Sequence, residues 1–593
     1  MKFLKVQAVE IAIGGIVFLG AGVAAVSPFT AGLHSINPMT APGLIGFLQA
    51  SLLVVGGVLG AALGTVTTAR QERDSHIRGH RFYNNYAQAA EALQQRLRRS
   101  FSAAQLESKI HGINIGGVEL SRAQEVRHTV LVGTSGAGKT ALLNSIIDQV
   151  LARGSRVLIH DPGGDFTERY YDPANTVLLG PWDERAAIWD AAVDIGTPAL
   201  VNEFATATVG RVQGENKSFY DGAATVLSGL IQSFMVSGQP WTWGQLASAL
   251  ALPPEAMAAI AVQGVPEVRT AVSSAFGKGD GLDKGDHSKF SIIGSATRWI
   301  KNYAVRDRYA SKRFSITNWL LGRDHDDIRI VILNSNPQYQ GACEAIFGAL
   351  LNCAVAMVNS AAMPLRSPDE PGDTWMFLDE LPQMGAAAME SVQKISELGR
   401  KRGFRAWLVM QAESQLAGVV GIAKAKPMLE VQGMRICTQC SPEVAAEVSK
   451  RIGERDVNRI STTNENGAFA GKRKELAREL VINPSDLTAL EARIGEAPNG
   501  VEMVMHVGDV LGRLLQPFPS KIKRAEPFIE SEIWKYGTLP GWLEKHQANV
   551  SELSAAAGRD ENTPVAILDT TLPPDIASDP TPAIDDIDSL LKL

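Results

Sequence analysis

A glycine-rich segment offers the clearest chemistry in the sequence. Residues 133–140 read Gly-Thr-Ser-Gly-Ala-Gly-Lys-Thr, between an apolar run at 127–132 and a helix-like segment. Glycines permit a turn whose backbone N–H groups face inward, and the helix start adds positive potential, so a phosphate-binding loop is predicted. We expect Lys139 to reach the β- and γ-phosphates of ATP and the Thr140 hydroxyl to bind Mg²⁺. The predicted nucleotide-binding residues are Gly133, Thr134, Ser135, Gly136, Ala137, Gly138, Lys139 and Thr140.

Two adjacent carboxylates end a second apolar run, at 375–380. A strand that ends in Asp-Glu places Asp379 at the carboxyl edge of a parallel sheet, beside the Mg²⁺ held by Thr140. Glu380 can then orient and deprotonate the attacking water. The alternative is an acidic strand end at a surface turn, and the phosphate-binding loop earlier in the chain disfavours it. We therefore predict that Asp379 is a metal ligand and that Glu380 and Lys139 are catalytic.

Three more apolar runs, at 155–160, 328–333 and 405–410, fit the same parallel sheet. Strands that alternate with helices predict an α/β fold with ligands at the carboxyl ends of the strands. The first run leads into Asp161-Pro-Gly-Gly-Asp-Phe166, and the last leads to Gln411. Gln411 is predicted to sense the γ-phosphate or position water. A solvated strand cap is the alternative for Gln411.

Composition and charge bound the possible functions. The chain has 593 residues, of which 45% are hydrophobic and 20% charged, so a wholly disordered or fibrous protein is excluded. The net charge is −6, and the last 34 residues alone carry −7, which leaves +1 for residues 1–559. Any surface that contacts DNA must therefore be a local basic patch rather than a global positive field.

The cysteines indicate a reducing compartment. Four cysteines in a chain of this length are too few for a disulfide framework. Cys437 and Cys440 have the spacing of half a zinc site or of a redox pair, but no second pair follows at ligand spacing. We expect a structural role for both residues.

The N-terminal region predicts a membrane hairpin. Residues 8–26 and 44–66 are apolar and long enough to cross a hydrocarbon core of about 30 Å. The connecting segment, 27–43, holds no Lys or Arg. Basic residues flank the pair on its outer sides: Lys2, Lys5, Arg70, Arg73, Arg78 and Arg81. The positive-inside rule then places both termini in the cytoplasm. A signal peptide is the alternative for the first span, but the second apolar span that follows disfavours it.

Several segments in order resemble one family, the coupling ATPases of conjugative type IV secretion (the TraD/TrwB/TraG group). The similar segments are 128–140, 161–166, 179–185 with Trp189, 219–223, 378–382, 397–403 and 411–416. They cover roughly residues 115–515, and their order is more specific than any one of them except the phosphate loop. Gly163 departs from the family, which often has Lys there. The short 27–43 segment resembles members without a periplasmic domain.

The resemblance implies a RecA-like P-loop nucleotide-binding domain with an inserted all-α domain, after a two-helix transmembrane hairpin. It also implies a homohexameric ring at the bacterial inner membrane that uses ATP and Mg²⁺. Such a ring moves relaxase-bound single-stranded DNA, with other relaxosome proteins as partners, towards the components of the secretion channel. The expected parts are a hairpin at 1–69, the nucleotide-binding domain at 70–195 and 301–530, the insertion at 196–300 and an acidic tail at 531–593.

Basic residues are assigned two further roles. In a ring, an arginine from the neighbouring subunit can neutralise the transition state, and Arg400 and Arg402 are the candidates. Phosphate contacts along a channel need only positive charge at modest density. The candidates for these contacts are Arg211, Lys217, Lys472, Arg473 and Lys474. Solvated surface charge is the alternative for both sets.

The C-terminal region, 551–593, is acidic, punctuated by Pro and nearly free of aromatic residues, which predicts a flexible tail. Its last ten residues, 584–593, differ, because the apolar residues at 584, 587, 590 and 591 recur at helical spacing. We expect this segment to dock a relaxosome or effector protein as an amphipathic helix. A solubilising tail is the alternative.

Other functions were weighed against a DNA motor. One is a chromosomal DNA translocase of the FtsK kind or another secretion ATPase, including one that moves protein without DNA. Another is a membrane receptor whose nucleotide site only switches its conformation. Glu380 beside Asp379 favours hydrolysis, because a pure switch does not need a carboxylate that activates water.

Overall fold

The computed structural model describes residues 75–99, 112–210, 212, 214–236, 238, 240–277, 282–323, 327–367, 370, 372–462, 472–495 and 499–536. Both predicted membrane spans, Arg211 and residues 537–593 of the predicted tail lie outside these residues, whereas the first six residues of that tail, 531–536, are described and include a short helix, α23 (Glu532–Tyr536). The chain divides into two compact units. One unit comprises residues 1–79 and 454–480, and the other comprises residues 80–453 and 481–593.

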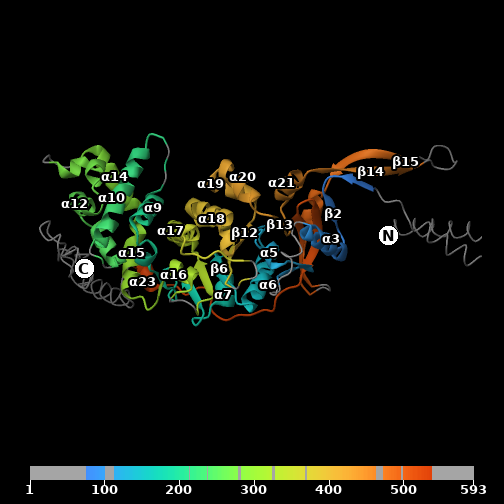
Figure 1. Ribbon diagram of the computed structural model, residues 1–593, viewed down its shortest axis with the longest axis horizontal. Helices are drawn as coiled ribbons and strands as arrows, with labels where there is room; N and C mark the ends of the chain where they lie inside the picture. The colour runs from blue at the N-terminus through green and yellow to red at the C-terminus, as the bar shows by residue number, and fades with distance from the viewer. Residues whose placement is uncertain are drawn as a thin grey trace, which may run out of the picture. The chain divides into compact units, whose positions relative to one another are not determined.

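The larger unit is built on an eleven-stranded mixed sheet (Figure 1). Its parallel part follows the spatial order β13 (Met434–Cys437), β5 (Thr129–Val132), β12 (Phe404–Met410), β11 (Thr374–Leu378), β6 (Arg156–Asp161), β10 (Ile330–Asn334) and β7 (Thr176–Leu179). The five apolar runs predicted as strands all lie in this part. The α/β class and the parallel pairing of these strands are therefore confirmed.

The sheet continues beyond β13 with strands that the sequence analysis did not place. β17 (Gly500–Val507) pairs antiparallel with both β13 and β18 (Val510–Gln516), and β16 (Ala492–Arg493) pairs with β17. β2 (Arg81–Tyr83) runs parallel to β18 at the edge. Only residues 508 and 509 separate β17 from β18, so a tight hairpin turn sets their antiparallel register. The expectation of a parallel sheet was thus incomplete.

Alternate side chains of the central strands fill two separate cores. Leu131, Val157 and Ile159 belong to a cluster with residues of α3 (Tyr86–Arg98) and α6 (Lys139–Ala152). Val130 and Leu158, which point to the opposite face, belong to a second cluster with residues of α17 (Gln340–Asn359) and α18 (Gly385–Leu398). Both faces of a parallel sheet must be covered in this way, because successive side chains alternate between its faces.

A run of helices separates β8 (Ile188–Trp189) from β9 (Arg313–Phe314), which pair with each other. The described elements of this run are α8 (Ala191–Asp194), α9 (Pro198–Val209), α10 (Lys217–Met235), α11 (Trp243–Leu250), α12 (Pro254–Gly264), α13 (Val268–Ala271), η1 (Ser273–Phe276), α14 (Lys284–Ala296) and α15 (Arg298–Arg308). The predicted all-α insertion at 196–300 falls within the run. Helix α10 crosses α12 so closely that a Cβ on Gly264 would lie 2.3 Å from the Gly229 carbonyl oxygen, which explains the glycine.

The smaller unit contains a three-stranded antiparallel sheet. Its strands are β1 (Ser75–Arg78), β14 (Glu454–Thr462) and β15 (Lys472–Leu480), and Arg78 pairs with Asp456 at 2.6 Å. The basic residues 472–474, which were predicted to contact DNA, begin β15. That prediction stays untested.

Among the described residues, one helix, at 337–359, is long and apolar enough to cross a membrane. The buried share of its most apolar window is 61%, and α17, which forms most of this helix, packs against α18 in the core.

A buried ion network closes the amino-terminal ends of the central strands. Asp373 accepts hydrogen bonds from Arg122 Nη1 at 3.0 Å, Arg153 Nη2 at 3.2 Å and the Trp375 indole at 2.6 Å. Arg405 Nη1 lies 3.5 Å from the same carboxylate. Burial alone would raise the pKa of Asp373, but the guanidinium groups, led by Arg405, hold it well below its ordinary value.

Asp373→Asn is expected to destabilise the fold by about 3–5 kcal/mol, because the buried guanidinium groups of Arg122 and Arg405 and the partly buried one of Arg153 would lose a shared carboxylate. Since the pKa of Asp373 is depressed in the folded state, its contribution is present above the ordinary pKa of about 4 and is lost as the pH falls below it. The free energy of unfolding, measured with urea, should therefore differ less and less between the wild-type chain and the variant as the pH drops from 5 towards the acid range. Asp221→Asn removes an exposed pair with Lys217 and serves as the control. Equal losses in the two variants would contradict the assignment.

Candidate active site

The glycine-rich loop lies between β5 and α6, where two neighbouring strands hold it in place. Gly133 N–H donates to the Met410 carbonyl at the end of β12 at 3.3 Å, and Thr134 N–H donates to Gln439 at 2.8 Å, just past β13. A Cβ on Gly133 would lie 1.9 Å from Thr438 Oγ1 and 3.2 Å from the Gln439 carbonyl oxygen, so the segment just past β13 leaves little room for a side chain at this position. The loop itself remains accessible, because Ser135 and Gly136 are exposed.

Lys139 is the first residue of α6, and its ammonium group lies inside the loop. Lys139 Nζ donates to the carbonyl oxygens of Gly133 at 2.9 Å and Thr134 at 3.1 Å, and it lies 3.5 Å from Glu380 Oε1. The first turn of a helix leaves backbone N–H groups without intrahelical acceptors. The loop therefore gathers an ammonium group and several amide donors, which together suit a phosphate chain.

Glu380 follows β11 and adopts a strained backbone conformation. Its φ of 45° is positive, a feature shared among the described non-glycine residues only with His128. Such a conformation costs on the order of 1–3 kcal/mol and tends to occur where function demands it. Gln411 Nε2 donates to Glu380 Oε1 at 3.1 Å. The structure thus brings the predicted residues Lys139, Glu380 and Gln411 together.

Asp379 is buried beside these groups. Its burial, and next the negative charge of Glu380, raise the pKa of Asp379 to about 7, while Lys139 opposes this shift. A cation beside the carboxylate would remove the cost of ionising it. Carboxylate and hydroxyl oxygens are ligands that Mg²⁺ accepts, so Asp379 and Thr140 fit a magnesium ion. Mg²⁺ usually keeps waters and substrate phosphates among its ligands, so one carboxylate and one hydroxyl are enough protein ligands for it.

His160, at the end of β6, was not predicted to belong to the site. Its Nδ1 lies 2.5 Å from the Asp379 carbonyl oxygen, and its Nε2 lies 2.7 Å from Ser335 Oγ. Burial lowers the pKa of His160 to about 4, so the ring is neutral and carries one proton. Because a carbonyl oxygen only accepts, Nδ1 holds that proton and Nε2 accepts from the Ser335 hydroxyl. One ring therefore ties together the ends of β11, β6 and β10.

Asp161 has a structural role in the Asp-Pro-Gly-Gly segment. Its carboxylate accepts hydrogen bonds from Gly164 N–H at 2.9 Å and from the N–H and hydroxyl of Thr167 at 2.7 Å each. These bonds fix the loop that precedes α7 (Asp165–Tyr170) at the same carboxyl edge of the sheet. Gly163 lies in this loop.

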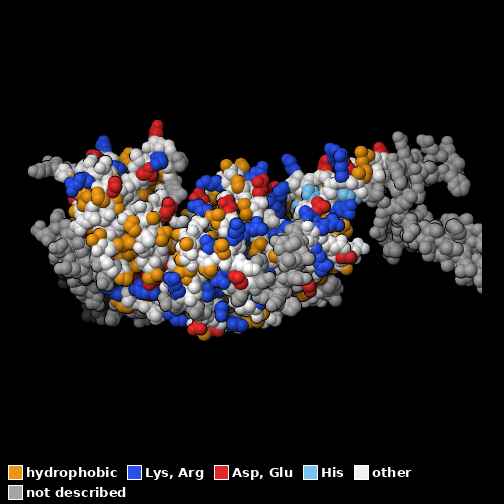
Figure 2. All heavy atoms as spheres, in the orientation of Figure 1, with side chains coloured by type: hydrophobic (Ala, Val, Ile, Leu, Met, Phe, Trp, Pro, Cys, Tyr) orange, Lys and Arg blue, Asp and Glu red, His pale blue; other side chains and the backbone are white. Residues whose placement is uncertain are grey.

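The predicted arginines are not brought to the phosphate loop of their own chain. Arg400 and Arg402 lie in η4 (Gly399–Arg402), directly before β12, whereas Gln411 follows the other end of that strand. Their role in a neighbouring subunit's site stays a prediction. Lys217, a predicted DNA contact, begins α10 and pairs with Asp221. On the face shown in Figure 2, basic and acidic side chains are interspersed, in keeping with the small net charge outside the tail. Cys437 and Cys440 are buried free thiols at and just beyond the end of β13.

The strand, glycine-rich loop and helix, with a carboxylate strand two places along the sheet, define a P-loop α/β protein. The family model described as "Type IV secretion-system coupling protein DNA-binding domain" matches residues 112–497. That match covers more than half of the chain, which therefore belongs to the family of type IV secretion-system coupling proteins.

Known proteins agree with this assignment. The coupling protein TraD of Escherichia coli (strain K12) is 22% identical over 393 residues, which are 65% of this chain and 52% of TraD. The chain thus aligns with only about half the length of that relative. The conjugative coupling protein TrwBΔN70 has a similar fold, with a TM-score of 0.61 and 19% identity over 77% of this chain and 97% of its own. TrwB in complex with ADP and Mg²⁺ gives a TM-score of 0.59 at 18% identity, over 77% of this chain and 98% of its own.

Proposed function

We propose that this protein is an ATP-hydrolysing coupling protein that recruits relaxase-bound single-stranded DNA and drives it towards a type IV secretion channel. The observation that carries the proposal is the convergence of Lys139 and Gln411 on Glu380 beside the phosphate loop. Family membership supports the coupling role. Structures of TrwB with GDPNP, with ADPNP, and with ADP and Mg²⁺ support a nucleotide as the ligand of this loop.

Each residue of the site has a task in hydrolysis. The loop N–H groups and Lys139 hold the phosphates, and Lys139 must exchange its two carbonyl partners for phosphate oxygens. Asp379 and Thr140 would hold Mg²⁺, which would neutralise charge on the phosphates. Glu380 orients the attacking water and accepts its proton, while Gln411 fixes the carboxylate through Oε1. Catalysis of this kind depends mainly on positioning and electrostatics.

The remaining parts of the proposal concern assembly. The protein is anchored in the bacterial inner membrane by two spans, at 8–26 and 44–66, with both termini in the cytoplasm. It works as a homohexamer in which Arg400 or Arg402 enters the neighbouring site. Arg211, Lys217, Lys472, Arg473 and Lys474 contact DNA phosphates. Relaxase and channel components are the protein partners.

The ATPase rate of the full chain in detergent tests the proposal. The rate should rise steeply with protein concentration and with single-stranded DNA, because a ring completes each site between subunits. Lys139→Ala identifies the activity that belongs to this loop. If Lys139→Ala had no activity but DNA left the wild-type rate unchanged, the result would favour a secretion ATPase that moves protein, or a nucleotide-switched receptor.

His160→Leu is expected to lower ATP turnover by about 10–100-fold, as loss of a group that positions a metal ligand does. The change leaves the Asp379 carbonyl without its donor. His160→Asn is the matched variant, since its amide can still donate, and it should retain most of the activity. Turnover is measured beside urea unfolding. If the two variants lose activity equally at equal stability, the hydrogen bond to Asp379 is not what matters.

A further inference from the structure

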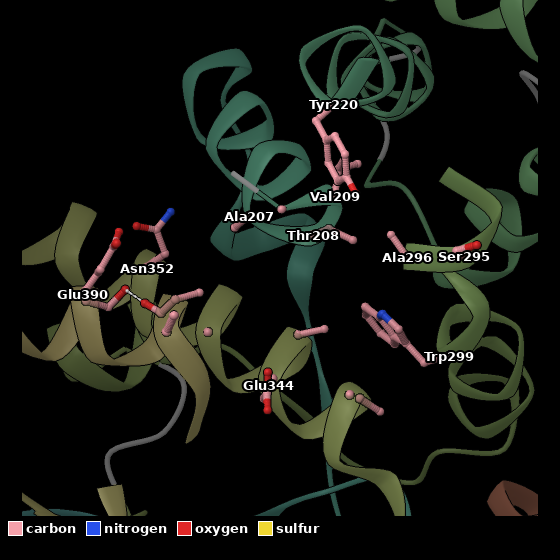
Figure 3. A pocket seen from close by; sticks show the side chains of 18 of the residues that line it. Ala207, Thr208, Val209, Tyr220, Ser295, Ala296, Trp299, Glu344, Asn352 and Glu390 are labelled. Atoms are coloured by element: carbon pink, nitrogen blue, oxygen red, sulfur yellow. Dashed lines mark hydrogen bonds between the residues drawn. The ribbon is translucent and has the colours of Figure 1, made fainter. Parts of the chain in front are cut away.

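A large cavity lies between the helical run and the sheet-covering helices of the same unit. Its volume is about 1170 Å³, and its walls come from α9, α10, α14 and α15 on one side and from α17, α18 and α19 (Glu413–Val420) on the other. In Figure 3, Tyr220 and Trp299 lie across the cavity from Asn352 and Glu390, with Glu344 between them at the base. None of the residues assigned to the phosphate site lines it.

The wall holds more basic than acidic side chains: Arg298, Lys394 and Lys424 against Glu344 and Glu390. Lys424 pairs with Glu390, and Glu344 accepts from Gln340 at 2.8 Å. Arg298 and Lys394 are exposed on the wall, and neither forms an ion pair within the described part of the chain. An occupant should therefore carry carboxylates.

Apolar groups complete the wall. Val209, Tyr220, Trp299, Val419 and Val420 line the cavity, and Val419 is 40% exposed. A fully exposed acidic peptide would leave this surface uncovered. The cavity instead suits an amphipathic segment with acidic residues on one side and branched aliphatic residues on the other.

The described chain ends close to this wall. Helix α23 (Glu532–Tyr536) packs against α15, where Asn302 Nδ2 donates to the Trp534 carbonyl at 3.0 Å. Asn302 lies four residues after Arg298 on α15, which is about 6 Å along a helix. The 47 residues of 537–583 span up to about 3.3 Å each, so 584–593 can reach any point of the cavity.

We propose that residues 584–593 bind in this cavity of their own chain. The segment reads Ile-Asp-Asp-Ile-Asp-Ser-Leu-Leu-Lys-Leu and supplies three aspartates for Arg298 and Lys394. As a helix it is about 15 Å long and about 10 Å wide, a cylinder of roughly 1,200 Å³. Its apolar residues at 584, 587, 590 and 591 face the wall formed by Val209, Tyr220 and Trp299. The segment expected to dock a partner protein thus has a site within the chain, and this docking does not depend on nucleotide hydrolysis.

Photocrosslinking of the full-length chain tests this proposal. Benzoylphenylalanine replaces Leu590, and after irradiation the crosslinked peptides are identified by mass spectrometry. We expect crosslinks to α9, α15, α18 or α19 within a species of monomer size on a denaturing gel. The probe at Thr563, outside the amphipathic segment, is the control for nonspecific labelling and should give few of them.

Charge reversal in the cavity tests whether the segment binds there through Arg298 and Lys394. Arg298→Glu with Lys394→Glu should lower the crosslink yield several-fold, whereas Lys284→Glu on α14, outside the cavity, should not. If the double variant fails to fold, raising the salt from about 0.1 M to about 1 M in the wild-type chain gives the same test, because the screening length falls from about 10 Å to about 3 Å. Crosslinks that map elsewhere, that join two copies, or that ignore both charge and salt would overturn the proposal.

Discussion

Lys139→Ala is expected to lower ATP turnover by at least about 10²–10³-fold, the usual cost of removing a donor that stabilises transition-state charge. The Lys139 ammonium group lies within the loop and 3.5 Å from Glu380, and among the described residues no other cation pairs with Glu380. Nucleotide affinity should fall as well, because the same group neutralises the phosphates before the reaction begins. Turnover of the full chain and binding of a fluorescent nucleotide are both measured.

Two variants act as controls for Lys139→Ala. Lys217→Ala removes an exposed lysine that pairs with Asp221 and should leave turnover without added DNA unchanged. Lys139→Arg keeps the charge but not the compact geometry of an ammonium group, so it should not rescue activity. If Lys139→Ala turned over ATP as fast as the wild type after subtraction of the background of the preparation, the loop would not be the site of hydrolysis.

Glu380→Gln should lower ATP turnover by about 10²–10⁴-fold, while nucleotide binding persists. The amide has the shape of the carboxylate and can keep a hydrogen bond to Gln411, but it cannot accept the proton of the attacking water. It also removes a negative charge that lies 3.5 Å from Lys139, so binding of the anionic nucleotide should not weaken. A single-turnover measurement with bound nucleotide separates the chemical step from binding.

Glu397→Gln is the matched control for Glu380→Gln, because its carboxylate accepts from Gln393 on the exposed side of α18, away from the loop. It should behave as the wild type does. If Glu380→Gln and Glu397→Gln turned over ATP equally fast, Glu380 would not be the group that accepts the proton of the attacking water.

The residues that converge in the site follow from the sequence because of one geometric rule. Glu380 and Gln411 each come at the end of an apolar run, Lys139 comes at the end of the loop that follows another, and the carboxyl ends of parallel strands meet at one edge of a sheet. His160 satisfies the same rule, yet its role depends on β6 lying between β11 and β10. Strand order is a tertiary property that no local pattern in this chain reveals.

The parts of the fold that were missed have short or ambiguous patterns. Strand β7 has four residues, all buried, and a run of that length is not distinguishable from part of a buried helix by periodicity. β17 is buried on both sides along most of its length, so it lacks the alternation that marks a hairpin strand. The role of Gln439, whose carbonyl holds the phosphate loop, rests on β13 lying beside β5, again a matter of strand order.

Two neutral histidines give the protein an acid-sensitive interior. His128 donates to the Ser396 carbonyl and accepts from Ala406 N–H, while His160 bridges three strand ends, and burial lowers the pKa of each to about 4. In the unfolded chain each would take up a proton near pH 6.5. Stability is therefore retained above that value and falls as the pH drops from about 6.5 towards 4, before Asp373 begins to titrate. At near-neutral pH both rings are uncharged, so the hydrogen bonds by which His160 joins the ends of β6, β10 and β11 are kept.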